Sequence, residues 1–132
     1  MSEPQPTGSL AFRTVAMPAD TNPAGDIFGG WIMSLMDLAA GTAASDRARG
    51  RTATAAVSHL TFLRPVKIGD VVSVFTDVTR VGRTSIVLTV EAWAVQRGQR
   101  DLHKVTSAEF VMVALDKDGK PTPVPAEDEA GP

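Results

Sequence analysis

A single long apolar segment, from Phe28 to about Arg47, constrains the fold of this chain more than any other feature. After Phe28 it reads GGWIMSLMDLAAGTAASDR, is rich in Met, Leu and Ala, and contains no proline, which favours a helix. Apolar or small residues occupy nearly every side of that helix, a pattern typical of a buried helix. The rest of the chain is therefore expected to wrap around it.

Period-two alternation of apolar residues dominates the chain after the helix. Such alternation predicts strands with one buried face each. The predicted buried faces are Val72, Val74, Thr76 and Val78; Ile86, Leu88, Val90 and Ala92; and Thr106, Ala108, Phe110, Met112 and Ala114. Strands also fit Leu10–Ala16 and Ala53–Phe62.

Turn-forming residues separate the predicted strands at Lys67–Asp70, Val81–Arg83, Arg97–Asp101 and Asp116–Lys120. The order of strand, helix and four strands predicts an α+β domain with one long central helix. An antiparallel sheet of about five strands, the last four forming a meander, would wrap that helix. Because one sheet covers only one flank of a helix, a dimer is expected.

The 132 residues are enough for one domain and short of the usual size for two. Residues 10–120 carry the periodic patterns and form the predicted domain. Residues 1–9 are rich in Pro, Gly and Ser, and residues 121–132 combine four prolines with three acidic residues. Both ends are therefore predicted to be flexible tails.

Composition excludes several classes of protein. A formal net charge of -2 gives no reason to expect a nucleic-acid partner. The absence of cysteine removes a disulfide scaffold and a thiolate nucleophile. No stretch resembles a secretory signal or approaches the roughly 20 apolar residues that cross a membrane. We expect no membrane association and a cytoplasmic location.

Asp37 is a carboxylate in the middle of the apolar helix, between Met36 and Leu38. Burying an unpaired charge costs on the order of several kcal/mol, so an Asp there is paired, exposed at an interface, or functional. Composition alone supports a bond to a neighbouring chain about as well as it supports catalysis.

The glycine-rich segment Gly25–Gly30 (GDIFGG) leads directly into the helix. Glycines allow close approach to the backbone, and free N–H groups at a helix start can stabilise a developing oxyanion. Taken alone, the segment is more simply a loop that enters a helix. Together with Asp37, about two turns further on, it supplies the donor and the carboxylate that acyl transfer needs.

A third motif, His59–Pro65 (HLTFLRP), contains one of several basic residues near predicted turns. Arg64 and Lys67, with Arg80 and Arg83 at another turn, could gather around phosphates. Solvated surface charge is the simpler interpretation.

The remaining polar residues have simple interpretations. His59 and His103 lie far apart in sequence without a ligand partner at motif spacing, so no metal site is predicted. No serine lies in a Gly-x-Ser-x-Gly motif. Glu91 and Glu109 alternate with apolar neighbours and are predicted to be solvent-facing or cross-strand charges.

Three motifs in order, MPADTNPAGDIFGGWIMSLMDLAAG, HLTFLRPVKIGD and VGRTS, closely resemble the YciA-type acyl-CoA thioesterases of the hotdog superfamily. The resemblance runs from about Phe12 to Pro121. It implies a hotdog fold, pairing of two domains into a double-hotdog dimer, a trimer of such dimers, and active sites at the dimer interface.

The resemblance also implies roles for individual residues. Asp37 would be the catalytic carboxylate, acting as general base or as nucleophile. Asn22 and Asp26 match polar loop positions that contribute across the dimer, and the backbone N–H groups near Gly29 and Gly30 match the oxyanion donors. The implied coenzyme A half-site consists of Thr61, Phe62, Arg64 and Pro65, with Arg83, Thr84 and Ser85 from a later turn.

The sequence therefore predicts an enzyme that hydrolyses acyl-CoA thioesters to a free acid and coenzyme A, without a further cofactor. A hotdog dehydratase would present an active-site His with an acidic partner, and neither His59 nor His103 lies at the helix start. A non-catalytic acyl-CoA-binding sensor is the other alternative. It would have little reason to keep Asp37 beside an uncharged thioester.

Overall fold

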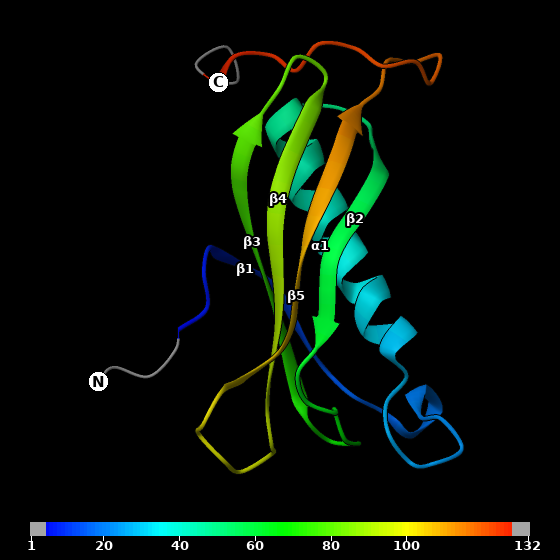
Figure 1. The fold of residues 1–132 in the computed structure, drawn as a ribbon, viewed down its shortest axis with the longest axis vertical. Coiled ribbons are helices and arrows are strands. Elements are labelled where there is room, and N and C mark those ends of the chain that lie inside the picture. Colours follow the sequence, from blue (N-terminus) through cyan, green and yellow to red (C-terminus); the bar gives the residue numbers. More distant parts are fainter. Residues whose placement is uncertain (1–4, 128–132) are drawn as a thin grey trace.

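A five-stranded antiparallel sheet covers one long helix in the computed structural model, which describes residues 5–127 (Figure 1). The elements are β1 (Ser9–Val15), η1 (Pro18–Asp20), α1 (Gly29–Ala48), β2 (Thr52–Phe62), β3 (Val71–Val81), β4 (Ser85–Val95) and β5 (His103–Ala114). The predicted order of strand, helix and four strands is confirmed. The helix and the first two strands begin and end within one residue of their predicted bounds.

The strands lie in the order β1-β3-β4-β5-β2, so β1 and β2 form the edges of the sheet. β3, β4 and β5 form a meander, but the prediction that all four strands after the helix do so is wrong, because β2 pairs with β5. Residues 63–70 connect β2 to β3 across the end of the sheet. Eight extended residues reach about 25 Å, more than the roughly 15 Å across three strand spacings.

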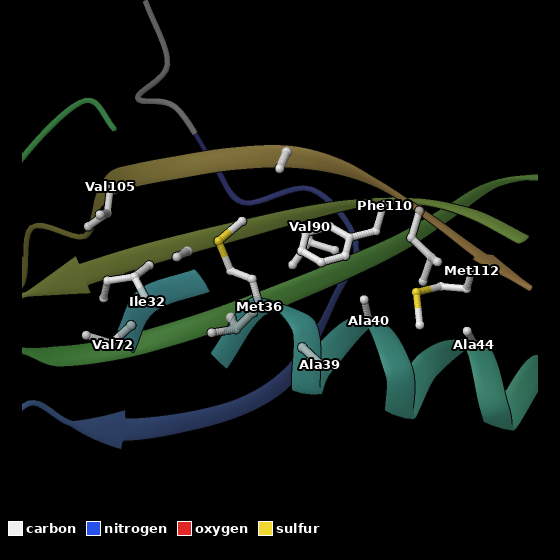
Figure 2. Close-up of a cluster of buried hydrophobic side chains, with 14 of the residues drawn as sticks. Ile32, Met36, Ala39, Ala40, Ala44, Val72, Val90, Val105, Phe110 and Met112 are labelled. Carbon is white, nitrogen blue, oxygen red and sulfur yellow. The ribbon is translucent and has the colours of Figure 1, made fainter. Parts of the chain in front are cut away.

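The core lies between α1 and the sheet (Figure 2). Ile32, Met36, Ala40 and Ala44 recur at every fourth position of α1, are buried, and face the strands. The two alanines let the second half of the helix lie close to the sheet. The predicted buried faces of β3, β4 and β5 are confirmed except at Val78, which is 38% exposed.

The opposite face of α1 is exposed in the single chain. Leu38 is 60% exposed and Met33 is 41% exposed, and Ser34 and Asp37 are exposed beside them. The sheet contacts only one side of α1, so the second flank of the helix is exposed in one chain, as the sequence predicted. Apolar residues on the other side remain available to another molecule.

The outer face of the sheet carries a buried carboxylate. Glu91 is 5% exposed and accepts hydrogen bonds from the Trp93 Nε1 and the Thr7 backbone N–H at 3.0 and 2.9 Å. Lys104 Nζ lies 3.3 Å from the other carboxylate oxygen. Of the two predicted alternatives, Glu91 is therefore a cross-strand charge and not a solvent-facing one. Glu109 is exposed and is the solvent-facing charge.

Both ends of the described chain are bonded to the domain. Thr7 contacts Glu91, the N–H of Val124 donates to the Arg83 carbonyl oxygen at 2.8 Å, and Arg47 Nη1 donates to the Pro125 carbonyl oxygen at 2.7 Å. These parts of the predicted tails are therefore attached, while the boundaries at residues 10 and 120 stay a prediction. The rest of the two predicted tails, residues 1–4 and 128–132, lies outside the described residues.

No helix within residues 5–127 combines the length and hydrophobicity that crossing a membrane requires.

Candidate active site

Asp37 lies on the exposed face of α1 and points toward β2. Thr54 of β2 donates a hydrogen bond from its Oγ1 to Asp37 Oδ1 at 2.5 Å. The carboxylate is therefore paired, one of the three outcomes that the sequence allowed, and it is exposed in the single chain. A charged acceptor makes such a bond stronger than one between neutral groups.

The local structure of β2 explains why Thr54 reaches the helix. Thr54 is opposite Met112 in the register with β5, and Met112 is buried in the core between the sheet and α1. Residues opposite each other in a sheet share a face, so Thr54 also faces α1. A register shift follows between Thr54 and Ala56. Bulges of this kind bend an edge strand and re-aim its side chains.

A hollow of about 460 Å³ opens beside Asp37 and Thr54. Leu38, Gly41 and Met112 contribute to its wall. A carboxylate at the rim of a partly apolar hollow can act on a neutral molecule that enters it.

The start of α1 leaves backbone donors free. Phe28 occupies the N-cap position without a side-chain cap, and the first hydrogen bond at this end is donated by Trp31 to the Phe28 carbonyl oxygen. The N–H groups of Gly29 and Gly30 therefore have no acceptor within residues 5–127. Free donors at a helix N-terminus suit an anionic oxygen.

Gly29 lies close to the Phe62 side chain at the helix start. A Cβ atom built on Gly29 would lie 3.2 Å from the Phe62 ring. The ring of Phe62, at the end of β2, thus lies against the helix start. A second hollow, of about 320 Å³, opens here and is lined by Ile27, Gly29, Ile32, Phe62, Leu63, Arg64, Pro65, Val66 and Val105.

The structure brings three members of the predicted coenzyme A half-site to this second hollow: Phe62, Arg64 and Pro65. Thr61 lies next to them on β2, and its carbonyl oxygen accepts a bond from Thr106 Oγ1 at 2.6 Å. The hollow therefore unites the helix start with part of the predicted half-site.

Arg83, Thr84 and Ser85 lie at the opposite end of the sheet (Figure 1). Ser85 pairs with Val113 of β5, whereas Phe62 pairs with Thr106. Seven residues along a strand correspond to about 23 Å. A single chain does not bring the two parts of the predicted half-site together, and Arg64 and Arg83 do not share a cluster in it.

Asn22 and Asp26 hold the loop before α1. Asn22 Oδ1 accepts hydrogen bonds from the N–H groups of Ala24 and Asp26, and the Asp26 carboxylate forms an ion pair with Lys67. Among residues 5–127, neither lines the hollow beside Asp37. Their predicted catalytic contribution stays a prediction, and within one chain their bonds are those of a loop.

Sequence reasoning missed Thr54. It falls inside a predicted strand, and a hydroxyl among alanines gives no sign of its partner. The bond to Asp37 depends on β2 lying beside α1, which the sequence pattern did not establish.

Within residues 5–127, no three His, Asp or Glu side chains gather in an arrangement that could hold a metal ion. The expectation that the protein needs no cofactor stays a prediction.

Fold and site together define a hotdog domain with an exposed carboxylate on its helix, and known proteins share the fold. A family model described as the thioesterase superfamily matches residues 24–100, a span that contains α1 and β2. The acyl-CoA thioester hydrolase YciA of Salmonella typhimurium is 48% identical over 127 residues, covering 92% of this chain and 94% of that protein. The chain therefore belongs to the thioesterase superfamily.

Solved structures agree on the fold. The hexameric thioesterase y2039 from Yersinia pestis has a TM-score of 0.89 at 43% identity, covering 92% of this chain and 99% of that one. Cj0915, a hexameric hotdog fold thioesterase of Campylobacter jejuni, has a TM-score of 0.84 at 41% identity, covering 93% of each chain. The family and the hotdog fold predicted from the sequence are confirmed.

Proposed function

We propose that this protein hydrolyses acyl-CoA thioesters to a free acid and coenzyme A, with Asp37 as the catalytic carboxylate. The observation that carries the assignment is the exposed carboxylate of Asp37, held beside a hollow on the helix of a thioesterase-superfamily domain. The activity itself is the one for which relatives such as YciA of Salmonella typhimurium are named.

The reaction needs a group that drives attack and a group that stabilises the oxyanion. In the general-base route, Asp37 takes a proton from water as the water oxygen bonds to the thioester carbon. In the nucleophilic route, Asp37 bonds to that carbon itself, and water then cleaves the mixed anhydride. In both routes the C–S bond breaks, and coenzyme A leaves as a thiolate that takes up a proton.

The donors and the carboxylate that act on one thioester come from two copies of the chain. Gly29 and Asp37 are eight residues apart on α1, about 12 Å along the helix axis. A carbonyl group must lie roughly 3 Å from both a donor and the attacking oxygen. The helix start of one copy beside Asp37 of another satisfies this requirement.

The exposed surface supports such pairing. Residues 53–57 of the β2 edge are exposed, and the exposed side chains of Met33 and Leu38 lie on the uncovered face of α1. An unpaired strand edge beside an apolar face suits a second copy. We propose a double-hotdog dimer and a trimer of such dimers, in line with the hexamers reported for y2039 and Cj0915.

Pairing of copies also bears on the coenzyme A half-site. Arg83–Ser85 and Phe62–Pro65 lie at opposite ends of one sheet. An antiparallel arrangement of two copies would therefore bring Arg83–Ser85 of one copy toward Phe62–Pro65 of the other. The roles of these residues in binding pantetheine or phosphates remain part of the proposal. The cytoplasmic location stays a prediction.

The test is release of free thiol from short, medium and long acyl-CoAs, followed with a thiol-reactive dye. Wild-type protein should release thiol, and Asp37→Asn should lose roughly 1,000-fold or more in kcat while keeping its oligomer mass, as expected for a group that acts in the transition state. Asp46→Asn, which changes another exposed aspartate of α1, is the matched control and should keep its activity.

Two results would contradict the proposal. Substantial activity in Asp37→Asn would remove Asp37 from the mechanism. Tight acyl-CoA binding by wild type without release of thiol would favour the sensor.

A further inference from the structure

Gly41 lies well inside α1, far from either end of the helix. It is surrounded in sequence by alanines, at Ala39, Ala40, Ala43 and Ala44. Glycine lowers the stability of a helix interior relative to alanine, because its backbone loses more conformational freedom on folding. The helix therefore carries a glycine at a position where alanine would stabilise it more.

The packing of the chain does not explain this glycine. Apart from its own helix, a Cβ atom built on Gly41 would meet only the Met112 Cε, at 4.0 Å, which is an ordinary van der Waals contact. At Gly29, by contrast, a Cβ atom would lie 3.2 Å from the Phe62 ring. Gly41 also lacks the positive φ that favours glycine. Within residues 5–127, therefore, no neighbour requires glycine at this position.

Gly41 instead borders the hollow of about 460 Å³ beside Asp37. The two residues are four positions apart on α1, so they lie on the same face of the helix, one turn from each other. Leu38 and Met112 line the same hollow. A molecule whose carbonyl carbon is attacked at Asp37 therefore has room to extend over Gly41, where a side chain would otherwise stand.

The lining of this hollow suits an uncharged chain. Asp37 is the only charged residue among the described residues that line it, so no cation there would meet a phosphate. The hollow at the helix start contains Arg64 instead. Hydroxyl groups around the Asp37 hollow are bonded within the chain: that of Thr42 donates to a backbone carbonyl oxygen at 2.9 Å, and those of Ser45 and Thr52 lie 2.9 Å apart. The hollow therefore suits the acyl chain of a thioester better than the phosphate end of coenzyme A.

We propose that Gly41 is a specificity-determining residue: because it has no side chain, the acyl chain of the substrate can extend along α1 beyond Asp37. This inference rests on the proposed function. A side chain at Gly41 would stand in the path of a long acyl chain and leave a short one unaffected. Gly41 thus sets the length of the acyl chain that the protein accepts.

The experiment measures thiol release from acetyl-CoA and octanoyl-CoA by the full-length protein and compares kcat/KM for the two substrates. Wild type should hydrolyse both. In Gly41→Leu, kcat/KM for octanoyl-CoA should fall roughly 100-fold and that for acetyl-CoA should stay within about threefold of wild type, because one misfitting methylene group in a pocket is worth roughly 10- to 200-fold. Gly41→Ala adds a smaller group and should lower the octanoyl-CoA value roughly three- to tenfold.

Asp46→Leu is the matched control, since it places the same side chain on an exposed part of α1 outside the hollow. Its ratio of octanoyl-CoA to acetyl-CoA activity should equal that of wild type. Thermal unfolding and oligomer mass are measured on each variant. Gly41→Ala should unfold at or above the wild-type temperature, because alanine favours the helix and fits the space beside Met112. Even if Gly41→Leu does not fold, this variant separates the fit of the substrate from a loss of folding.

Three outcomes would overturn the role of Gly41 and leave the proposed hydrolysis intact: an unchanged activity ratio in both Gly41 variants, an equal loss with both substrates, or a wild type that hydrolyses acetyl-CoA and not octanoyl-CoA. An equal loss together with a lower oligomer mass would assign Gly41 to a contact between copies instead. Failure of wild type to release thiol from any acyl-CoA would overturn the proposed function, and the role of Gly41 with it.

Discussion

The two faces of α1 both carry apolar residues, but they have opposite roles. One face presents Ile32, Met36, Ala40 and Ala44 to the sheet, where all four are buried (Figure 2). The other face presents Met33, Asp37 and Leu38 to the outside. Met36 and Asp37 are adjacent in sequence, yet about 100° of helical rotation places one in the core and the other at the candidate site.

The difference shows how one helix combines packing with chemistry. The buried face excludes charge, because an unpaired carboxylate there would lose its hydration without a partner. The outer face keeps a carboxylate in contact with water and with Thr54. Exposed apolar residues around it provide a surface on which another copy can pack.

Placing a carboxylate on the buried face of α1 should have the largest effect on the stability of the fold. Ala40 is fully buried, so Ala40→Asp places an unpaired charge in the core and should destabilise the fold by roughly 3–5 kcal/mol. Asp37→Ala, on the outer face, should change the unfolding free energy by less than about 1 kcal/mol. Urea unfolding followed by circular dichroism measures both. Equal stability of the two variants would mean that the faces do not differ as described.

A cavity in the core should have the next largest effect on the stability of the fold. Met36 is fully buried, and Met36→Ala should cost about 2–5 kcal/mol through lost burial and the cavity left behind. Because the contact lies within one chain, the difference from wild type should be the same at low and high protein concentration. A loss that appears only in dilute protein would place Met36 at an interface instead.

A change on the outer face should have the smallest effect on the fold and act mainly on assembly. Leu38→Gln keeps good helix propensity and removes an apolar side chain that is 60% exposed in the single chain. If another copy covers Leu38, association should weaken roughly tenfold or more. Light scattering across a dilution series measures the mass. Met36→Ala serves as the control, and an unchanged mass profile for Leu38→Gln would argue against pairing through this face.

Period-two and helical patterns predicted most of the fold. The alternation in β3, β4 and β5 identified their buried faces because burial on one side of a strand leaves that pattern in the sequence. The position of β2 could not be obtained in this way. The pattern within a strand does not show which other strand lies beside it, so it does not separate an edge strand from a central one. Residues 63–70 are equally compatible with a tight turn to a neighbouring strand and with a crossover to a distant one.

The candidate site was predictable in part. Asp37 stood out because a charge in an apolar helix is costly, and the glycines before the helix stood out because they free backbone donors. Thr54 was not identifiable, since its significance lies entirely in its distance from Asp37. The grouping of Arg64 with Arg83 did not follow from sequence either, because two basic turns can lie at the same end of a sheet or at opposite ends.

Local residue preferences determined the elements of this protein and its candidate catalytic residue: one helix, five strands, and a carboxylate at Asp37. These preferences act over a few residues, within the reach of propensity, alternation and the cost of charge. Only the tertiary structure decided that β2 lies at the edge beside β5, that one face of α1 stays uncovered, and that Thr54 meets Asp37. Such contacts join distant parts of the chain, and their free energy depends on packing that no local pattern records.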